Sequence, residues 1–138
     1  MISNLQNNIS FNGFTPIKVD ERLLRGGAIL LPENFRKAKE LGVTQIIDLR
    51  NSAEIRSFTE KLLCKIFGIK YINYKYPHRL NYIPNNDFFE QINQSIINNE
   101  GKTYIHCQYG KRRTGIAVAI YEKRYTNKST GEIIKNML

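Results

Sequence analysis

The chain has 138 residues, a length that suits one domain with a buried core but not two ordinary domains. Hydrophobic residues make up 41% and charged residues 24% of the sequence, which excludes a wholly disordered chain and a collagen-like repeat. Apolar runs such as 28–31 and 115–121 are much shorter than the roughly 18 residues that a membrane-spanning helix needs. We expect a single domain over residues 1–138, with 1–15 as a mobile leader.

The charge balance is strongly basic: 21 Lys and Arg face 12 Asp and Glu, which leaves a net charge of +9. This surplus favours an anionic substrate or partner. Nucleic acid is the general interpretation of a basic chain, but the sequence has neither a recognition-helix pattern nor zinc-ligand spacing, so we do not expect a nucleic-acid partner. Neither a metal nor an organic cofactor is expected, and the sequence leaves the oligomeric state open.

Cysteine usage and the amino terminus bear on location. Residues 1–10 are rich in Asn and lack the basic start and apolar block of a signal peptide. The two cysteines, Cys64 and Cys107, are too few for a disulfide framework, so we expect free thiols. Both features predict a cytoplasmic protein, with export by a route without a cleaved signal as the alternative.

The first third of the chain predicts extended segments followed by a helix. Residues 17–20 and 22–29 are expected to be extended. Pro32 stands where the first turn of a helix tolerates it, and Gly42 is the expected stop. The apolar positions of this helix at helical spacing are Phe35, Ala38 and Leu41.

The middle of the chain predicts a strand, a helix and a second strand. Residues 43–49 form a short apolar strand, and Ser52 opens a helix that ends at Gly68. Residues 69–74 predict the next strand. The expected buried stripe of the helix is Ile55, Phe58, Leu62 and Ile66.

The last part of the chain begins with a loop at 75–84, which has two prolines and no periodicity. A helix follows, with Asp87 and Glu90 in capping-box spacing. Its apolar positions are Phe88, Ile92 and Ile96. Residues 102–106 predict a strand, and 114–125 predict a helix whose buried positions are Ile116, Ala119 and Ile120. A short final helix is capped by Ser129 with Glu132.

Strands and helices alternate along the chain, and this predicts an α/β fold with a central, mostly parallel sheet flanked by helices. In such folds ligands bind beyond the carboxyl ends of the strands.

The segment 106–115 (HCQYGKRRTG) lies between a predicted strand and a predicted helix. A Cys at the strand end, five loop residues and an Arg in the first helical turn suit a phosphate dianion, because the loop N–H groups and the helix N-terminus are both electropositive. Gly110 lets the backbone curl toward the ligand, and the planar guanidinium of Arg113 grips two phosphate oxygens. The predicted phosphate-binding residues are Gln108, Tyr109, Gly110, Lys111, Arg112 and Arg113.

The same loop predicts a nucleophile. Its positive potential should depress the pKa of Cys107 below the ~8.5 of a free thiol and favour the thiolate. Thr114 is expected to hydrogen-bond the sulfur and help it to leave, and His106 is expected to fix the loop by hydrogen bonds to the backbone. A buried core thiol beside a solvated basic turn is the alternative interpretation of Cys107. Cys64, among apolar neighbours, predicts core packing.

The run Cys-x-x-Gly-Lys-x-Arg-Thr-Gly after His106 resembles the signature of the cysteine-dependent protein tyrosine phosphatase superfamily. It is most similar to the dual-specificity branch, which includes small atypical enzymes and phosphoinositide phosphatases. The segments 24–27 (LRGG) and 42–50 (GVTQIIDLR) are similar to the same branch. The resemblance covers about 23–125 and implies a tyrosine phosphatase-like fold, a phosphocysteine formed on Cys107, and catalytic roles for Arg113 and Thr114.

The chain departs from this pattern at the general acid. The resemblance implies an Asp about thirty residues before the nucleophile that protonates the leaving oxygen. Aligning Tyr76 with the aromatic-Pro start of the family segment places Leu80 at that position, and 75–86 holds no acid. Asp87 is the first candidate acid, although we favour its interpretation as a helix cap, and His78 is a weaker candidate.

A missing acid bears on the substrate. Leaving groups that depart without help favour phosphotyrosine and phosphoanhydrides over phosphoserine and phosphothreonine. We therefore expect a phosphorylated protein or a polyphosphorylated small molecule such as a phosphoinositide, inositol polyphosphate or inositol pyrophosphate. An RNA triphosphatase and a phosphate-binding pseudophosphatase are alternatives. The basic residues that suit a polyphosphorylated substrate, or form a solvated surface, are Lys75, His78, Arg79, Lys111 and Arg112.

Overall fold

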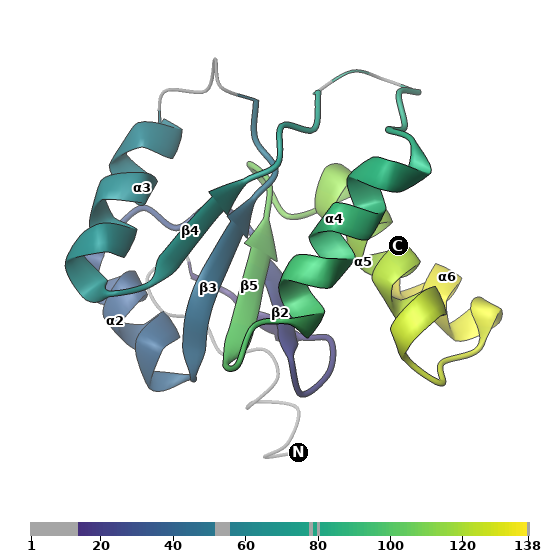
Figure 1. Cartoon of the computed structure of the whole chain (residues 1–138), viewed down its shortest axis with the longest axis horizontal. Coiled ribbons are helices and arrows are strands. Elements are labelled where there is room, and N and C mark those ends of the chain that lie inside the picture. The colour runs from purple at the N-terminus through teal and green to yellow at the C-terminus, as the bar shows by residue number, and fades with distance from the viewer. Residues whose placement is uncertain (1–13, 52–55, 78, 80, 138) are drawn as a thin grey trace.

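The computed structural model describes residues 14–51, 56–77, 79 and 81–137. In this part of the chain a five-stranded sheet has the order β1-β2-β5-β3-β4 and carries helices on both faces (Figure 1). The strands are β1 (Ile17–Lys18), β2 (Leu23–Gly26), β3 (Val43–Asp48), β4 (Lys70–Asn73) and β5 (Lys102–His106). The helices are α2 (Pro32–Glu40), α3 (Arg56–Phe67), α4 (Asn86–Ile97), α5 (Arg112–Tyr125) and α6 (Thr130–Met137).

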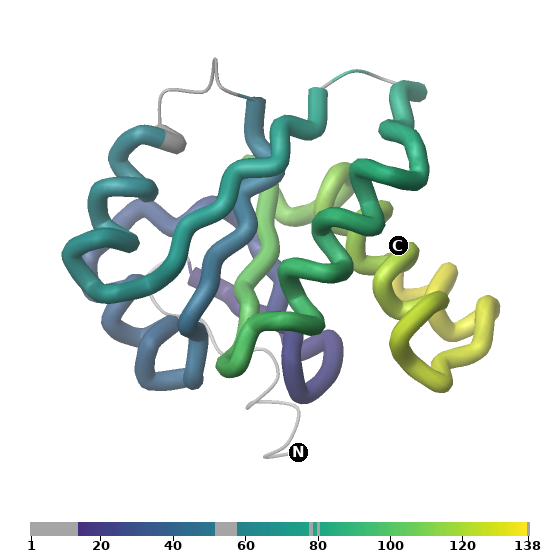
Figure 2. The backbone as a smooth tube through the Cα atoms, viewed as in Figure 1, coloured from purple at the N-terminus to yellow at the C-terminus, as the bar shows by residue number. Residues whose placement is uncertain are grey.

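Only the edge pair β1–β2 is antiparallel, and β2–β5, β5–β3 and β3–β4 are parallel. The predicted α/β class with a mostly parallel sheet is therefore confirmed. The backbone trace shows that the segments after β3, β4 and β5 leave the sheet at one edge before α3, α4 and α5 begin (Figure 2). That edge is where a ligand site is expected in a sheet of this kind.

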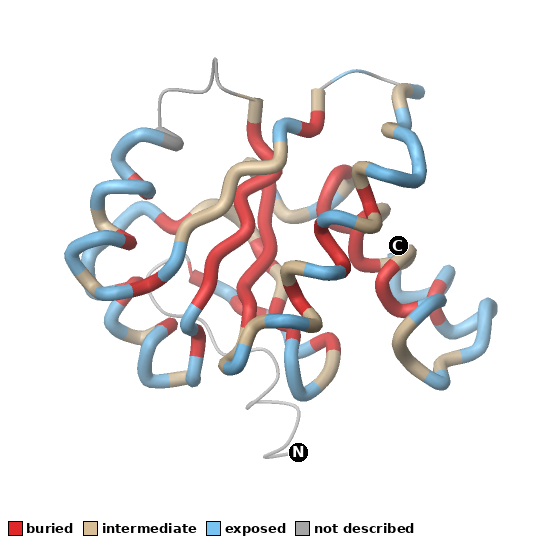
Figure 3. The backbone as a smooth tube through the Cα atoms, viewed as in Figure 1, coloured by how far each residue is buried: buried red, intermediate tan, exposed pale blue. Residues whose placement is uncertain are grey.

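Two hydrophobic cores lie on the two faces of the sheet, and the strand period of two divides neighbouring residues between them. Ile46 and Tyr104 belong to the core under α2 and α3, whereas Ile47 and Ile105 belong to the core under α4 and α5. The three inner strands are buried along most of their length, as the red segments of Figure 3 show. A rigid sheet buried on both faces fixes the positions of the loops at its edge.

The predicted buried stripe of the second helix is wrong. Phe58, Leu62 and Ile66 are 76%, 51% and 67% exposed, and Ile55 lies outside the described residues. The helix instead turns Glu60 and Cys64 inward, and both are almost completely buried. The physical reason is tertiary: on the buried side of α3, Glu60 meets an ionic partner inside the protein, and Leu63 and Phe67 pack against the core.

Two further corrections concern helix detail. The N-cap of α4 is Asn85, whose side chain accepts a hydrogen bond from the backbone N–H of Phe88, so Asp87 is not the cap. In α5 the buried apolar positions are Ala117, Val118 and Tyr121, while the predicted Ile116, Ala119 and Ile120 are half-buried.

The cap predicted for the last helix is confirmed, because Ser129 accepts the N–H of Glu132. No helix in the described ranges is long and apolar enough to cross a membrane.

Candidate active site

The loop 107–111 connects the carboxyl end of β5 to the start of α5. Lys111 is the N-cap of α5, and its side chain makes no capping hydrogen bond. The N–H groups of the first turn are therefore not capped by that side chain, and the electropositive end of the helix faces the loop. Gly110 adopts a φ of +72°, a backbone conformation that residues other than glycine rarely adopt. The local sequence thus bends the backbone into a cradle for an anion.

A cavity of about 250 Å³ opens above this loop and brings most of the predicted site together. Cys107 lies at its base, only 3% exposed, and Tyr109 stands at its surface. The residues that line the cavity are Cys107, Tyr109, Lys111, Arg112 and Arg113. Gln108 and Gly110 contribute backbone groups to the loop. The Gln108 carbonyl accepts a hydrogen bond from the Ala28 N–H, and the Gly110 N–H is directed to Cys107.

The surroundings of Cys107 favour its thiolate. Burial alone would raise the pKa of this thiol. Thr114, the Gly110 N–H and the charge of Arg113 together outweigh burial. The buried Thr114 hydroxyl has no other hydrogen-bond partner among the described residues, so it is free to serve the sulfur. Together these groups lower the pKa of Cys107, which makes the sulfur a better nucleophile near neutral pH.

The guanidinium of Arg113 is oriented before any ligand binds. Its side chain is buried, and Nη1 donates to the carbonyl oxygen of Tyr76 at 3.2 Å. The neighbouring Arg112 donates from Nη2 to the carbonyl oxygen of Arg79 at 2.6 Å. Both contacts tie the segment after β4 to the first turn of α5, so this segment lies beside the site.

The end of β2 supports the loop from behind. Arg25 donates from Nη2 to the carbonyl oxygen of Gly110 at 3.1 Å, and the N–H of Ala28 donates to that of Gln108 at 3.2 Å. A Cβ on Gly110 would lie 2.3 Å from the backbone of Gly26. The sequence 24–27 was expected only as part of a family resemblance, whereas in the fold it shapes the phosphate-binding loop.

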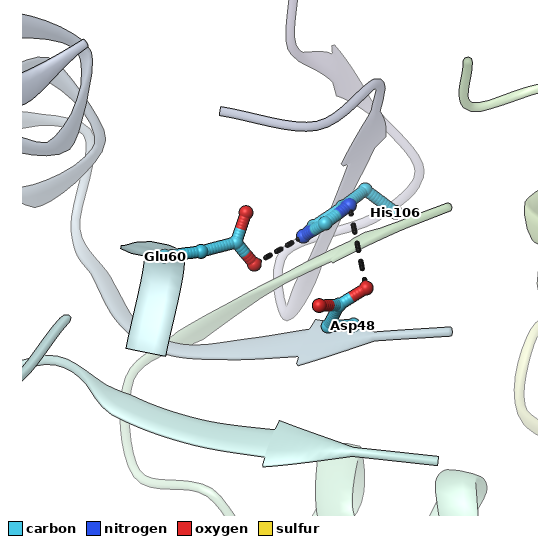
Figure 4. A group of neighbouring side chains, drawn as sticks. All are labelled: Asp48, Glu60 and His106. Carbon is cyan, nitrogen blue, oxygen red and sulfur yellow. Dashed lines mark hydrogen bonds and ion pairs between the residues drawn. The ribbon is translucent and has the colours of Figure 1, made fainter. Parts of the chain in front are cut away.

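A buried ionic network lies below the cysteine and joins β3, α3 and β5 (Figure 4). His106 contacts the Cys107 carbonyl oxygen through Nδ1 at 2.8 Å and Glu60 Oε1 through Nε2 at 2.5 Å. Asp48 accepts two hydrogen bonds from the guanidinium of Arg50, at 3.0 and 3.1 Å. The predicted role of His106, a hydrogen bond to the backbone of the loop, has this geometry.

Asp48, Glu60 and His106 are of the residue types that bind metals, and their ligand atoms lie within 4.8 Å of one another. Asp48 accepts hydrogen bonds from Arg50, and Glu60 Oε1 is bonded to His106. Glu60 Oε2 has no hydrogen-bond partner among the described residues and lies 3.4 Å from the guanidinium of Arg50. The guanidinium also supplies the positive charge that would otherwise come from a cation. The residues therefore fit an ion-pair network better than a metal centre.

The first candidate acid, Asp87, is not brought to the cavity. Asp87 is exposed in the first turn of α4, where it lines a surface cleft with Tyr74 and Glu90 instead of the cavity above Cys107. His78 and Leu80 lie outside the described residues. Arg25, Arg50 and Glu60 were not predicted as site residues. The available signal for Glu60 was that it is the single acid in a helix whose other charged residues are basic. The prediction that Cys64 packs in the core is confirmed.

The Tyrosine phosphatase family is the family whose sequence model matches this chain, over residues 18–124. The chain belongs to this family. It is thus a phosphatase of the cysteine-dependent type that its loop sequence resembles. No curated protein matches the chain.

Solved structures share the fold at low sequence identity. Tk-PTP in its active form superposes with a TM-score of 0.74 at 14% identity, covering 93% of this chain and 84% of Tk-PTP. The core catalytic domain of the PP-IP phosphatase SIW14 from S. cerevisiae has a TM-score of 0.73 at 22% identity, covering 88% and 72%. A putative phosphatase from Shewanella putrefaciens has a TM-score of 0.71 at 20% identity, covering 99% and 85%.

Proposed function

We propose that the protein hydrolyses phosphate monoesters through a phosphocysteine on Cys107. The observation that carries this proposal is the position of the Cys107 sulfur at the base of a cavity lined by Arg113, with its pKa lowered by Thr114 and Gly110. Binding of phosphate alone would not require an activated thiolate, so this arrangement favours turnover over a phosphate-binding pseudophosphatase.

The proposed reaction has two displacements at phosphorus. The Cys107 thiolate attacks the phosphorus, the S–P bond forms, and the P–O bond to the leaving group breaks. Arg113 and the loop N–H groups bind the three equatorial oxygens and stabilise the charge on them. Water then attacks the phosphocysteine and releases inorganic phosphate, while the sulfur leaves as a thiolate stabilised by the Thr114 hydroxyl.

The proposed first substrate class is the phosphotyrosine protein. The sequence 74–86, part of which is hydrogen-bonded to Arg112 and Arg113, holds no Asp or Glu, and Asp87 faces a different cleft. General acid assistance contributes about 10²–10⁴-fold for poor leaving groups and much less for an aryl oxide. The described residues bring no carboxylic acid to the leaving group, and a site of this kind selects phosphotyrosine over phosphoserine.

A second candidate is a phosphoanhydride in a polyphosphorylated small molecule. Lys111 and Arg112 line the cavity, and the exposed Lys75 and Arg79 belong to the segment that is hydrogen-bonded to Arg112 and Arg113. This concentration of positive charge favours a substrate with several phosphates, and phosphate is also a leaving group that needs little protonation. SIW14, which shares the fold, is a PP-IP phosphatase.

The test is phosphate release from a panel of substrates by the parent and by Cys107→Ser. The panel contains a phosphotyrosine peptide, a phosphothreonine peptide, a phosphoinositide, an inositol pyrophosphate and 5′-triphosphorylated RNA. We expect cleavage of the phosphotyrosine peptide or the pyrophosphate well above the phosphothreonine peptide. No release from any substrate, with phosphate still bound, would instead identify a pseudophosphatase.

The cellular location proposed for this activity is the cytoplasm. The structure describes both cysteines as free thiols. An unpaired nucleophilic thiol needs a reducing compartment to stay active, and the cytoplasm provides one.

A further inference from the structure

The ring of His106 lies between two hydrogen-bond acceptors in a completely buried position. Nδ1 is 2.8 Å from the carbonyl oxygen of Cys107, and Nε2 is 2.5 Å from Oε1 of Glu60. A carbonyl oxygen only accepts hydrogen bonds, and so does an ionised carboxylate. With Glu60 ionised, both ring nitrogens must donate, and His106 is then an imidazolium cation.

The charges around this ring assign Glu60 as its counter-ion. On β3, Asp48 is held by the guanidinium of Arg50 and lies 4.0 Å from Nδ1. Arg50 also forms an ion pair with the second oxygen of Glu60, at 3.4 Å. On β4 and β5 the facing titratable groups are Tyr71, which donates to Asp48, and Tyr104, whose ring centroid is 5.7 Å from that of His106. Burial alone would lower the pKa of His106, but Glu60 outweighs it and the pKa is raised.

The orientation of α3 shows how strongly this contact is selected over hydrophobic burial. Phe58, Leu62 and Ile66 share one face of the helix, and turning that face inward would bury three large apolar side chains. The helix leaves them exposed and buries Glu60 together with Cys64, while Leu63 and Phe67 pack against the core from the same helix. Burying a carboxylate is unfavourable unless it is paired, so the pairing with His106 is the interaction that this orientation secures.

We propose that Glu60 is a positioning residue for the nucleophile. Through the imidazolium of His106 it keeps a proton on Nδ1, and the Nδ1–H fixes the carbonyl of Cys107 and places positive charge beside the sulfur. The effect adds to that of the groups that already face Cys107 from the loop, α5, β2 and the segment after β4. These groups are the Gly110 N–H, Thr114, Arg113, Arg25 and Tyr76. The effect of Glu60 on catalysis rests on the proposed function of Cys107 as nucleophile. The effect of Glu60 on the ionisation of the Cys107 thiol does not depend on that function.

The test compares Glu60→Gln, which preserves shape and removes the charge, with Glu40→Gln on the surface of α2 as the matched control. The pH dependence of alkylation of Cys107 by iodoacetamide, followed by mass spectrometry of the Cys107 peptide, reports its thiolate without any substrate. We expect the inflection in Glu60→Gln to move upward by about one pH unit and that of Glu40→Gln to stay at the parent value. A purely structural role for Glu60 would leave this inflection unchanged, and that result would overturn the proposal.

A second measurement does not depend on whether Glu60→Gln folds. Nitrogen NMR of the His106 ring in the parent protein should show both nitrogens protonated at pH 7, because the pair with Glu60 keeps the cation. A neutral ring at pH 7 would overturn the proposal even if the enzyme hydrolyses phosphate. A shifted inflection in an inactive protein would uphold the role of Glu60 and refute the proposed phosphatase reaction.

Discussion

Gly110 in the catalytic loop packs directly against Gly26 at the end of β2. A Cβ on Gly110 would lie 2.3 Å from the carbonyl carbon and oxygen of Gly26, closer than non-bonded atoms approach. Arg25, next to Gly26, donates to the carbonyl of Gly110 from the same side. The curvature of the loop is therefore set by a strand that lies more than eighty residues earlier in the chain.

Gly110→Ala should damage both the loop and the enzyme. The substitution adds the clash with Gly26 to the penalty of a positive φ, and we expect a loss of about 2–4 kcal/mol in the free energy of unfolding. The displaced cradle should lower kcat/KM by about 10²-fold or more. Gly131→Ala is the matched control, because a Cβ there meets no atom within 4 Å. Denaturant unfolding and phosphate release measure the two effects, and equal behaviour of the two variants would contradict this account of the loop.

Arg113→Lys should lower kcat/KM by about 10²-fold although the charge is kept, because an ammonium cannot contact two phosphate oxygens in one plane. Arg36→Lys on α2 provides the control, since the Arg36 guanidinium pairs only with Glu40 on the surface among the described residues. The measurement is steady-state kinetics on an aryl phosphate. A rate for Arg113→Lys within about threefold of the parent, a barrier change under ~1 kcal/mol, would assign Arg113 a different role.

The two cysteines should differ sharply in reactivity. Burial raises the pKa of Cys64 to about 12, whereas the loop lowers the pKa of Cys107 and the cavity exposes its sulfur to small reagents. Thiolate therefore persists on Cys107 as the pH falls below the normal range of a thiol. Brief treatment of the folded protein with iodoacetamide at pH 7 should modify Cys107 alone, and treatment in urea should modify both. Equal labelling of Cys64 in the folded protein would contradict the environments assigned to the two thiols.

Asp87→Asn should change little. Asn85 caps α4 and remains in the variant, so we expect a loss of about 0.3–1 kcal/mol in the free energy of unfolding from the weaker interaction with the helix dipole. The parent should cleave aryl phosphates with acidic leaving groups much faster than alkyl phosphates, and the variant should show the same dependence. The measurement is kcat/KM for a series of aryl phosphates. A flat dependence in the parent that becomes steep in Asp87→Asn would show that Asp87 is the general acid after all.

The catalytic loop could be predicted because its information is local in sequence. Cys107, Gly110 and Arg113 lie within seven residues, and a strand before them and a helix after them suffice to arrange a cradle. The orientation of α3 could not be predicted in this way. Helical periodicity favoured burial of Phe58 and Leu62. Contacts with distant parts of the chain bury another face, because Glu60 meets a histidine 46 residues away and Phe67 stacks on Phe35 of α2.

The cap of α4 illustrates another limit. Asn85, Asn86 and Asp87 are all residue types that favour an N-cap, and the sequence alone does not say which of them leaves the helical conformation. In the structure Asn85 has the extended backbone conformation of an N-cap, so the helix begins at Asn86. Asp87 then lies in the first turn, where it is exposed. A shift of two residues therefore changes both the cap and the interpretation of the candidate acid.

The central claim is a covalent intermediate on Cys107, and rapid quenching tests it most directly. The parent protein is mixed with an excess of a reactive aryl phosphate, quenched in acid within one turnover, digested and examined by mass spectrometry, with Cys107→Ser treated in parallel. The account predicts a phosphoryl group on the Cys107 peptide of the parent, and neither turnover nor a phosphorylated peptide from Cys107→Ser, which should still bind inorganic phosphate. Substantial turnover by pure Cys107→Ser, or steady hydrolysis by the parent with no phosphorylated cysteine at any quench time, would contradict it.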